Sequence, residues 1–247
     1  EGDEYLSSPI DRRPKFHLYR ATIGVISGIA WDHINVFPTF DNYVEQFRLF
    51  LTTIEPEGTI IYNQEDETVA GLVKKENVNL KKVGYSSPES FIKDGITYLK
   101  LDEQSAPLLV FGKHNLQNIE AARHVCNSLG VSDKQFYLSI STFKGAARRL
   151  ELLGKNSFTS VYKDFAHSPS KLRATIDAVK EQFPDRQVIA VMELHTFSSL
   201  NKDFLNEYRG CMDMADVAVV FISNKTFEQK KMEPYDQNIV KQAFGND

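Results

Sequence analysis

The second half of the chain shows a regular alternation of strand-like and helix-like segments, and this pattern constrains the fold more than any other feature. Short apolar segments typical of strands lie at residues 157–162, 187–192 and 216–222, and helical patterns lie at 169–183 and 201–214. Parallel strands need long crossover connections, and helices usually supply them. The order therefore predicts an α/β fold with a parallel sheet covered by helices.

The first half mixes strands with helices. Asp41 is expected to cap a helix that follows Pro38. Another helix is expected to begin after Gly112 and to end at Gly130, since glycine is the usual residue just past a helix C-terminus. The other expected elements are strands at 23–30, 59–62 and 80–85, a hairpin at 91–110, a helix at 66–75 and a short helix opened by a Ser132–Gln135 capping box.

The best domain boundary is the small and basic stretch K-G-A-A-R-R at residues 144–149. A chain of 247 residues is long enough for two domains, which we place at residues 1–145 and 146–247. The chain has no initiator Met and opens inside a polar motif. We expect it to be a piece of a larger protein, with the second domain truncated.

Composition excludes several classes of function. The formal net charge of -4 gives no general attraction for phosphate backbones, so nucleic acid is not an expected partner. No apolar run approaches the roughly 20 residues that span a bilayer, and no signal peptide is visible. Two cysteines, Cys126 and Cys211, form neither a disulfide framework nor a metal site, so the cytoplasm is the expected location.

A first candidate site follows the strand expected at 23–30. Asp32 and His33 come just past its end, where ligands bind in α/β sheets, and residues 1–4 supply further carboxylates. A carboxylate with an imidazole could hold a divalent ion there, although Mg²⁺ prefers oxygen ligands. The structural alternative is that Asp32 caps a turn and His33 packs against its neighbours.

Three more polar clusters have both a functional and a structural interpretation. Asn115 and Asn118 share one side of a first helical turn, where amides could contact a purine, although asparagine there is usually a cap. Arg148 and Arg149 could clamp phosphate, or form a solvated basic patch. Residues 162–169 lie at the ligand edge of a Rossmann-like sheet, or form a simple capped loop.

The order and spacing of these motifs are more informative than any one of them. Together they resemble the Mur ligase family of peptidoglycan synthesis over nearly the whole chain. The motifs are E-G-D-E-Y, D-R-R-P-K-F-x-x-Y, W-D-H, G-K-H-N-L-Q-N-I-E-A-A, F-K-G-A-A-R-R-L-E and Y-K-D-F-A-H-S-P-x-x-x-R-A-T-I.

The resemblance implies part of a central ATPase domain, a mixed sheet with helices, followed by a Rossmann-like C-terminal domain. It also implies an ATP- and Mg²⁺-dependent ligase that forms an amide bond. In this family ATP phosphorylates the carboxylate of UDP-N-acetylmuramate, and an amino acid or short peptide then attacks the acyl phosphate. The implied partners are those small molecules, with no membrane involved.

The resemblance also implies roles for individual residues. Glu1 matches the family's Mg²⁺-binding glutamate, and His33 matches a histidine that holds a second Mg²⁺. His195, in L-H-T-F-S-S, is similar to a histidine near the substrate.

Four further residues match positions that contact the nucleotide. Asn115 and Asn118 resemble the asparagines of the H-N-x-x-N motif, with Asn118 toward the adenine. Arg149 and Asp164 resemble the pair through which the C-terminal domain grips the nucleotide on closure.

The chain also departs from the family pattern. It contains no G-x-x-x-x-G-K-[ST] phosphate-binding loop and no UDP-sugar domain, both of which we expect upstream of Glu1. The usual D-H-x-D reads D-H-I-N, with Asn35 in place of a carboxylate, and Ser168 replaces a histidine. If the natural protein lacks the phosphate-binding loop, the alternative is a non-catalytic nucleotide-binding module.

The motifs of this chain resemble two branches of the family. E-G-D-E-Y with D-R-R-P-K-F favours the branch that rejoins the recovered tripeptide L-Ala-γ-D-Glu-meso-diaminopimelate to UDP-N-acetylmuramate. M-E-L-H-T-F-S-S is closer to the branch that adds L-alanine. The recycling branch is the favoured interpretation.

Overall fold

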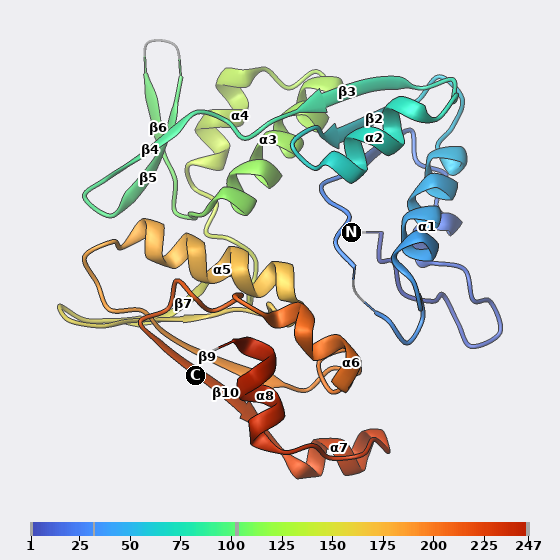
Figure 1. The fold of residues 1–247 in the computed structure, drawn as a ribbon. Coiled ribbons are helices and arrows are strands. Elements are labelled where there is room, and N and C mark those ends of the chain that lie inside the picture. The colour runs from blue at the N-terminus through green and yellow to red at the C-terminus, as the bar shows by residue number, and fades with distance from the viewer. Residues whose placement is uncertain (1, 32, 102–103, 246–247) are drawn as a thin grey trace. The chain divides into compact units, whose positions relative to one another are not determined.

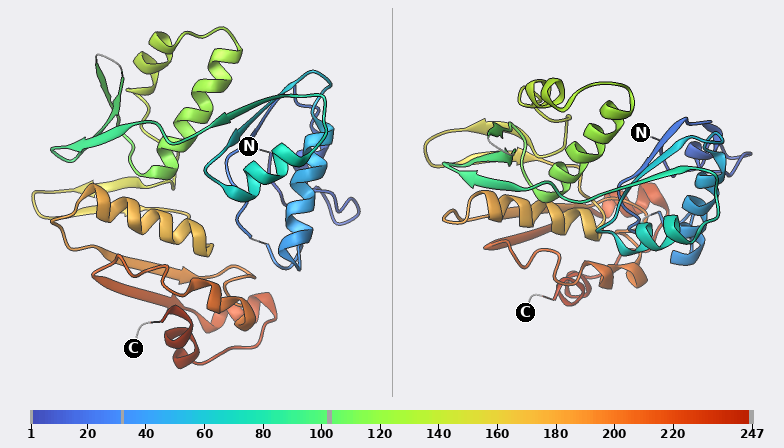
Figure 2. Two further views of the ribbon diagram at one scale, coloured as in Figure 1. Left: turned by 45° about the horizontal axis from the view of Figure 1, so that its top comes forward. Right: turned by 90° about the horizontal axis from the view of Figure 1, so that it is seen from above.

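The computed structural model describes residues 2–31, 33–101 and 104–245, drawn as a ribbon in Figures 1 and 2. The chain forms two compact units, which are described separately. The first contains the residues up to 88 together with 116–138, and the second contains 89–115 with the residues from 139 onward. Two helices, α3 (Lys113–Ser128) and α4 (Asp133–Ile140), contribute residues to both units.

The first unit is built on a parallel sheet in the order β1-β2-β3. Helices α1 and α2 connect successive strands, as the sequence pattern predicts. The unit also begins with a short 3₁₀ helix, η1 (Lys15–Leu18). The bounds are β1 (Ile23–Ile26), α1 (Phe40–Thr53), β2 (Thr59–Asn63), α2 (Glu67–Lys75) and β3 (Lys81–Tyr85).

Local hydrogen bonds set the ends of these elements and correct two predictions. The cap of α1 is Thr39, whose hydroxyl accepts from the amide of Asn42 at 3.2 Å, so Asp41 lies inside the helix. Strand β1 ends at Ile26 and not at residue 30. The chain leaves the sheet there because the amide of Ile29 donates to the carboxylate of Asp66, the cap of α2, at 3.0 Å.

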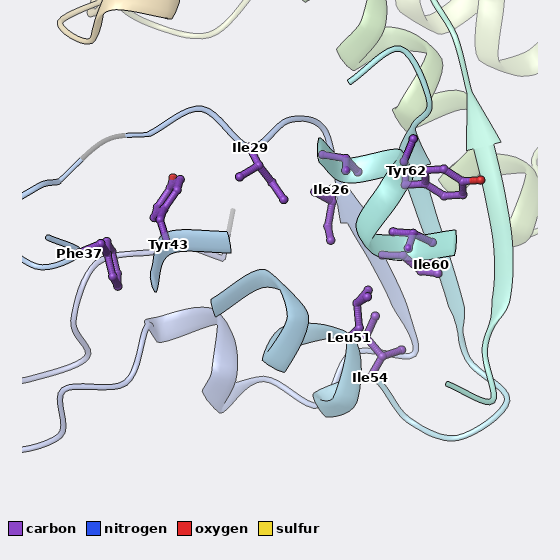
Figure 3. Packing of buried hydrophobic residues seen from close by; sticks show 11 residues of the cluster. Ile26, Ile29, Phe37, Tyr43, Leu51, Ile54, Ile60 and Tyr62 are labelled. Carbon is purple, nitrogen blue, oxygen red and sulfur yellow. The ribbon is translucent and has the colours of Figure 1, made fainter. Parts of the chain in front are cut away.

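The core of the first unit lies between the sheet and helices α1 and α2. Leu51 of α1 and Ile54, the residue just past its end, pack with Ile60 of β2, and all three are nearly inaccessible to solvent. Burial of each such side chain contributes about 1.5–3 kcal/mol. Strand β2 also buries Ile61 on its other face, as expected for the central strand of a parallel sheet. Figure 3 shows Ile26, Ile29, Phe37, Tyr43, Leu51, Ile54, Ile60 and Tyr62 of this core.

The second unit combines an antiparallel sheet, a hairpin and a parallel pair of strands. The predicted turn at Asp94-Gly95 joins β4 to β5, with φ of 51° and 73° at the two residues, the left-handed pair that a tight hairpin favours. Strands β9 and β10 are parallel, and α5 precedes them as predicted. The bounds are β4 (Ser90–Lys93), β5 (Ile96–Lys100), β6 (Ser105–Pro107), α5 (Pro169–Gln182), β9 (Ile189–Leu194) and β10 (Val217–Ile222).

The strand predicted at 157–162 does not join the parallel pair. It forms β8 (Ser160–Lys163), which pairs antiparallel with β7 (Glu151–Lys155), a strand that the sequence pattern did not reveal. The reason lies in the connecting turn. The side-chain oxygen of Asn156 accepts the amides of Phe158 and Thr159 at 2.8 and 2.7 Å and reverses the chain.

The predicted helix at 201–214 is also shorter in the structure. It consists of α6 (Lys202–Leu205) and the 3₁₀ turn η2 (Asn206–Tyr208), and Gly210 follows with a φ of 71°. A left-handed residue cannot continue a right-handed helix. Beyond β10, the chain forms α7 (Asn224–Lys230) and α8 (Gln237–Phe244), which the sequence interpretation omitted.

The capping box that opens α4 is confirmed. The hydroxyl of Ser132 accepts the amide of Gln135 at 3.4 Å, and the Gln135 side chain accepts the amide of Ser132 at 3.0 Å. Within the described ranges, no helix combines the length and the apolar character needed to cross a bilayer.

Candidate functional site

The start of α3 carries the first candidate residues. Gly112 precedes the helix with a φ of 93°, and a Cβ atom there would lie 2.5 Å from the Cβ of Ala178. Only glycine fits this close approach without a shift of its neighbours. The side-chain amide of Asn115 donates to the carbonyl of Phe111 at 2.8 Å, so Asn115 fixes the turn, although this bond is not the helix cap of the structural alternative, in which the side-chain oxygen accepts a backbone amide. Asn118, three residues further along the helix, is exposed.

Arg149 lies in an unusual stretch of backbone. Its neighbours Arg148 and Leu150 have φ of 58° and 47°, a conformation uncommon for residues other than glycine. Such strain persists only where surrounding contacts hold it, and it concentrates at functional sites. The Arg149 guanidinium carbon lies 5.9 Å from the ring centroid of Phe165, within range of a cation–π interaction.

Asp164 supplies a contact that holds this stretch. Its carboxylate accepts the amide of Leu150 at 2.7 Å and the amide of Ala166, also at 2.7 Å. The hydroxyl of Thr175 adds a longer contact at 3.3 Å. Asp164 therefore positions the residue next to Arg149, and these two of the four predicted nucleotide-binding residues form one structural group.

His114 connects this group with the start of α3. Burial lowers the pKa of His114 below the ordinary value, while the nearby charges of Asp164 and Arg149 act on it in opposite directions. Its Nδ1 atom is inaccessible and makes no hydrogen bond within the described part of the chain. The structure thus brings Arg149 and Asp164 close to the residue beside Asn115. The sequence interpretation quoted His114 in a motif but gave it no role, although its place next to Asn115 was the available signal.

The predicted substrate residue His195 follows the end of β9. Its Nδ1 atom lies 3.1 Å from the carbonyl of Glu193, and its ring centroid lies 6.3 Å from that of His167. His167 makes the same type of contact, with Nδ1 2.8 Å from the carbonyl of Phe165. A carbonyl only accepts, so Nδ1 is the donor in both contacts. Sequence reasoning did not predict this pairing.

His33 lies in the first unit, with a left-handed φ of 57°. Its Nε2 atom lies 3.4 Å from a carboxylate oxygen of Glu4, and its ring meets that of Tyr5 edge-on with centroids 5.2 Å apart. The other predicted metal ligand, Glu1, is outside the described residues, as is Asp32. In the parts of the chain that are described, no three His, Cys, Asp or Glu side chains gather as a metal site.

The donor chemistry around His33 is compatible with part of a Mg²⁺ site. Magnesium usually takes one or two carboxylates from a protein and fills its octahedron with phosphate oxygens and water. Glu4 supplies one carboxylate beside the imidazole of His33. A pair of this kind fits the ion only when a phosphate ligand and water complete the shell.

Two family models match the chain. The Mur ligase middle domain matches residues 7–126, and the Mur ligase, glutamate ligase domain matches residues 148–243. His114 and Asn115 lie in the first match, and Arg149 and Asp164 lie in the second.

Curated relatives agree with these matches. The UDP-N-acetylmuramate–L-alanine ligase of Caldicellulosiruptor bescii is 30% identical over 232 residues, which is 89% of this chain and 49% of that protein. The enzyme of the same name from Aquifex aeolicus is 27% identical over 80% of this chain and 46% of its own length. The chain therefore spans about half the length of the curated relatives that it matches.

Solved structures share the fold. A murein peptide ligase from Psychrobacter arcticus superposes with a TM-score of 0.61 at 22% identity, covering 98% of this chain and 51% of that one. A UDP-N-acetylmuramate–alanine ligase from Thermotoga maritima superposes with a TM-score of 0.63 at 17% identity, and the match covers 91% of this chain and 55% of that one. The MurF ligase of Thermotoga maritima, in complex with ADP, superposes with a TM-score of 0.67 at 17% identity, and the match covers 86% of this chain and 51% of that one.

Proposed function

This chain belongs to the Mur ligase family, and on that premise we propose that the full-length protein is an ATP-dependent ligase of peptidoglycan recycling. It joins the amine of L-Ala-γ-D-Glu-meso-diaminopimelate to the carboxylate of UDP-N-acetylmuramate. The curated relatives support the broader activity, an amide ligase that acts on UDP-N-acetylmuramate. The choice of the tripeptide as amine donor rests on the opening motifs E-G-D-E-Y and D-R-R-P-K-F.

One observation carries the nucleotide-binding part of the proposal. His114, next to Asn115, is within electrostatic range of both Arg149 and Asp164. His114 belongs to one family match and the two charged residues to the other, which supports a nucleotide site formed by both matched segments. An exposed arginine beside a helix start is a suitable arrangement for phosphate, because the guanidinium pairs bidentately and the helix N-terminus favours negative charge.

We assign the following roles to the chain's own residues. Asn115 shapes the turn before α3, and Asn118 on the same helix contacts the adenine. Asp164 holds the backbone beside Arg149 through the amide of Leu150, and Arg149 contacts the phosphates.

On the metal and substrate side, His33 and Glu1 bind Mg²⁺. His195 contacts the substrate at the end of β9. Bound Mg²⁺ would neutralise phosphate charge during transfer to the UDP-sugar carboxylate. The protein's own contribution is to bind and orient the reactants and to exclude water from the acyl phosphate.

A second amine donor has support of its own. The curated relatives are named as L-alanine ligases, and the segment M-E-L-H-T-F-S-S is similar to that branch. L-Alanine is therefore the alternative substrate. It leaves the reaction type and the residue assignments unchanged.

The experiment is phosphate release by the full-length protein with ATP, Mg²⁺ and UDP-N-acetylmuramate. One reaction contains the tripeptide, a second contains L-alanine, and a control omits the UDP-sugar. Release that requires both the tripeptide and the UDP-sugar supports the recycling ligase. Release with L-alanine alone keeps the reaction class but changes the donor, and no release with either donor contradicts the proposed activity.

A further inference from the structure

A short polar network connects the opening motif E-G-D-E-Y with the loop that contains His33. The side-chain amide of Asn35 donates to the hydroxyl of Tyr5 at 3.0 Å, although 30 residues separate them. Asn35 is the residue that departs from the family's D-H-x-D pattern. The asparagine at this position therefore has a specific partner, the hydroxyl of Tyr5.

The residue before Tyr5 reaches the same loop. A carboxylate oxygen of Glu4 lies 3.4 Å from Nε2 of His33 and accepts from the hydroxyl of Tyr43, also at 3.4 Å. The ring of Tyr5 meets the His33 imidazole at 75°, with centroids 5.2 Å apart. Two consecutive residues of the opening motif therefore contact His33, and one of them also binds Asn35.

The backbone of this loop needs such support. His33 adopts a φ of 57°, a left-handed conformation that is unfavourable for a residue other than glycine and persists only where its surroundings hold it. The amides of Val36 and Phe37 donate to the carbonyl of His33 at 2.8 and 2.9 Å, which fixes the turn after the histidine. Phe37 is 3% exposed and anchors that end in the core. The contacts of Glu4 and Tyr5 restrain the imidazole itself.

We propose that Tyr5 and Asn35 are positioning residues that fix the His33 imidazole for metal binding, an inference that rests on the proposed function. The Tyr5 ring packs against the imidazole, and the hydrogen bond from Asn35 fixes the ring of Tyr5. The bond tolerates the exchange of Asp for Asn because a tyrosine hydroxyl both donates and accepts. With Asn35 the amide donates to Tyr5, whereas with Asp the hydroxyl would donate to the carboxylate.

The test measures Mn²⁺ binding to the full-length protein in the presence of ADP, with the electron paramagnetic resonance signal of free Mn²⁺ as the readout. Tyr5→Phe removes only the hydroxyl, and Asn35→Leu removes only the amide. We expect each variant to raise the half-saturating Mn²⁺ concentration about threefold or more. The double variant should show no further increase, because both changes break the same hydrogen bond.

A conservative exchange separates positioning from general stability. Asn35→Asp can form the bond with reversed polarity, so its half-saturating concentration should return to or below that of the wild type. Tyr19→Phe, at an exposed tyrosine of the same unit, is the matched control and should leave binding unchanged. Thermal unfolding of every variant is recorded in parallel.

The outcomes distinguish this proposal from the proposed function. If Tyr5→Phe and Asn35→Leu bind Mn²⁺ as the wild type does, the positioning role is wrong, whether or not the variants melt earlier. If Asn35→Asp binds as weakly as Asn35→Leu, the hydrogen bond is not the cause. If the wild type shows no saturable Mn²⁺ binding, the metal site at His33 is itself wrong.

Discussion

The hydroxyl of Thr97 donates to the side-chain oxygen of Gln182 at 2.7 Å, and both residues are buried although 85 positions separate them. The amide nitrogen of Gln182 also donates to the carbonyl of Gly95 at 2.8 Å. Thr97 lies within the middle-domain match and Gln182 within the C-terminal match. These bonds tie the β4–β5 hairpin to the last turn of α5.

Loss of this contact should destabilise the second unit. Gln182→Leu leaves the buried Thr97 hydroxyl without that partner and removes the bond to the Gly95 carbonyl, which costs about 1–3 kcal/mol. Urea unfolding should show this decrease, and adding Thr97→Val should recover part of it, since two apolar partners of similar shape can be nearly neutral. Gln187→Leu, at an exposed glutamine, is the control and should stay within about 0.5 kcal/mol of the wild type. Equal effects of the two glutamine substitutions would contradict the role of the buried bonds.

Two glycine substitutions should have opposite effects. Gly112→Ala places a Cβ atom 2.5 Å from that of Ala178 at a φ of 93°, so it should destabilise the protein by more than about 1 kcal/mol. Gly71→Ala lies inside α2 with no atom within 4 Å of the new Cβ, so it should stabilise by about 0.5–1 kcal/mol. Chemical denaturation of both variants checks the signs. A Gly112→Ala protein as stable as the wild type would refute the close approach of α5 to this turn.

The stability of the protein should depend on pH through His114. Burial lowers its pKa below the ordinary 6.5, so the unfolded chain binds the proton more tightly than the folded protein does. The contribution of neutral His114 to the free energy of unfolding is fully present above pH 6.5. It is lost as the pH falls through that value toward the lower pKa of the folded state. Between pH 7.5 and 5.5 the free energy of unfolding should therefore fall more in the wild type than in His114→Phe. Parallel pH profiles for the two proteins would show that His114 does not titrate in this way.

Two asparagine variants should separate binding from structure, on the proposed function. Asn118 is exposed, so Asn118→Ala should raise the KM for ATP about tenfold, as loss of one to two kcal/mol of hydrogen bonding predicts, with little change in stability. Asn115→Ala also removes the bond to the carbonyl of Phe111 and should lower the stability by about 1 kcal/mol. The measurements are steady-state kinetics and thermal unfolding. An unchanged KM for Asn118→Ala would remove the adenine assignment.

Local sequence signals predicted the elements whose ends depend on nearby residues. The Ser132–Gln135 box opens α4 and Asp94-Gly95 turns the hairpin, as predicted, and the helix predicted at 66–75 is α2, with Asp66 as its cap. The cap of α1 was predicted wrongly because aspartate is the more common cap, whereas the structure uses Thr39.

Pairing between strands depends on contacts that a local pattern does not contain. The strand at β8 was recognised, but its antiparallel partner depends on the turn that Asn156 closes. The same limit applies to the candidate site. The resemblance proposed Arg149 and Asp164 as candidates, yet it could not show that Asp164 accepts the amide of Leu150 or that the half-buried His114 lies within range of their charges.

The left-handed backbone of His33 restricts which residues can replace it during divergence. Asn, Asp and His adopt this conformation several-fold more often than other non-glycine residues, whereas β-branched residues are rarely found there. On the proposed function, two independent requirements therefore act on position 33: the left-handed backbone and an imidazole that binds the metal. His33→Asn preserves the first while removing the imidazole, and His33→Ala disturbs both, so only the asparagine variant reports the chemistry of the side chain alone.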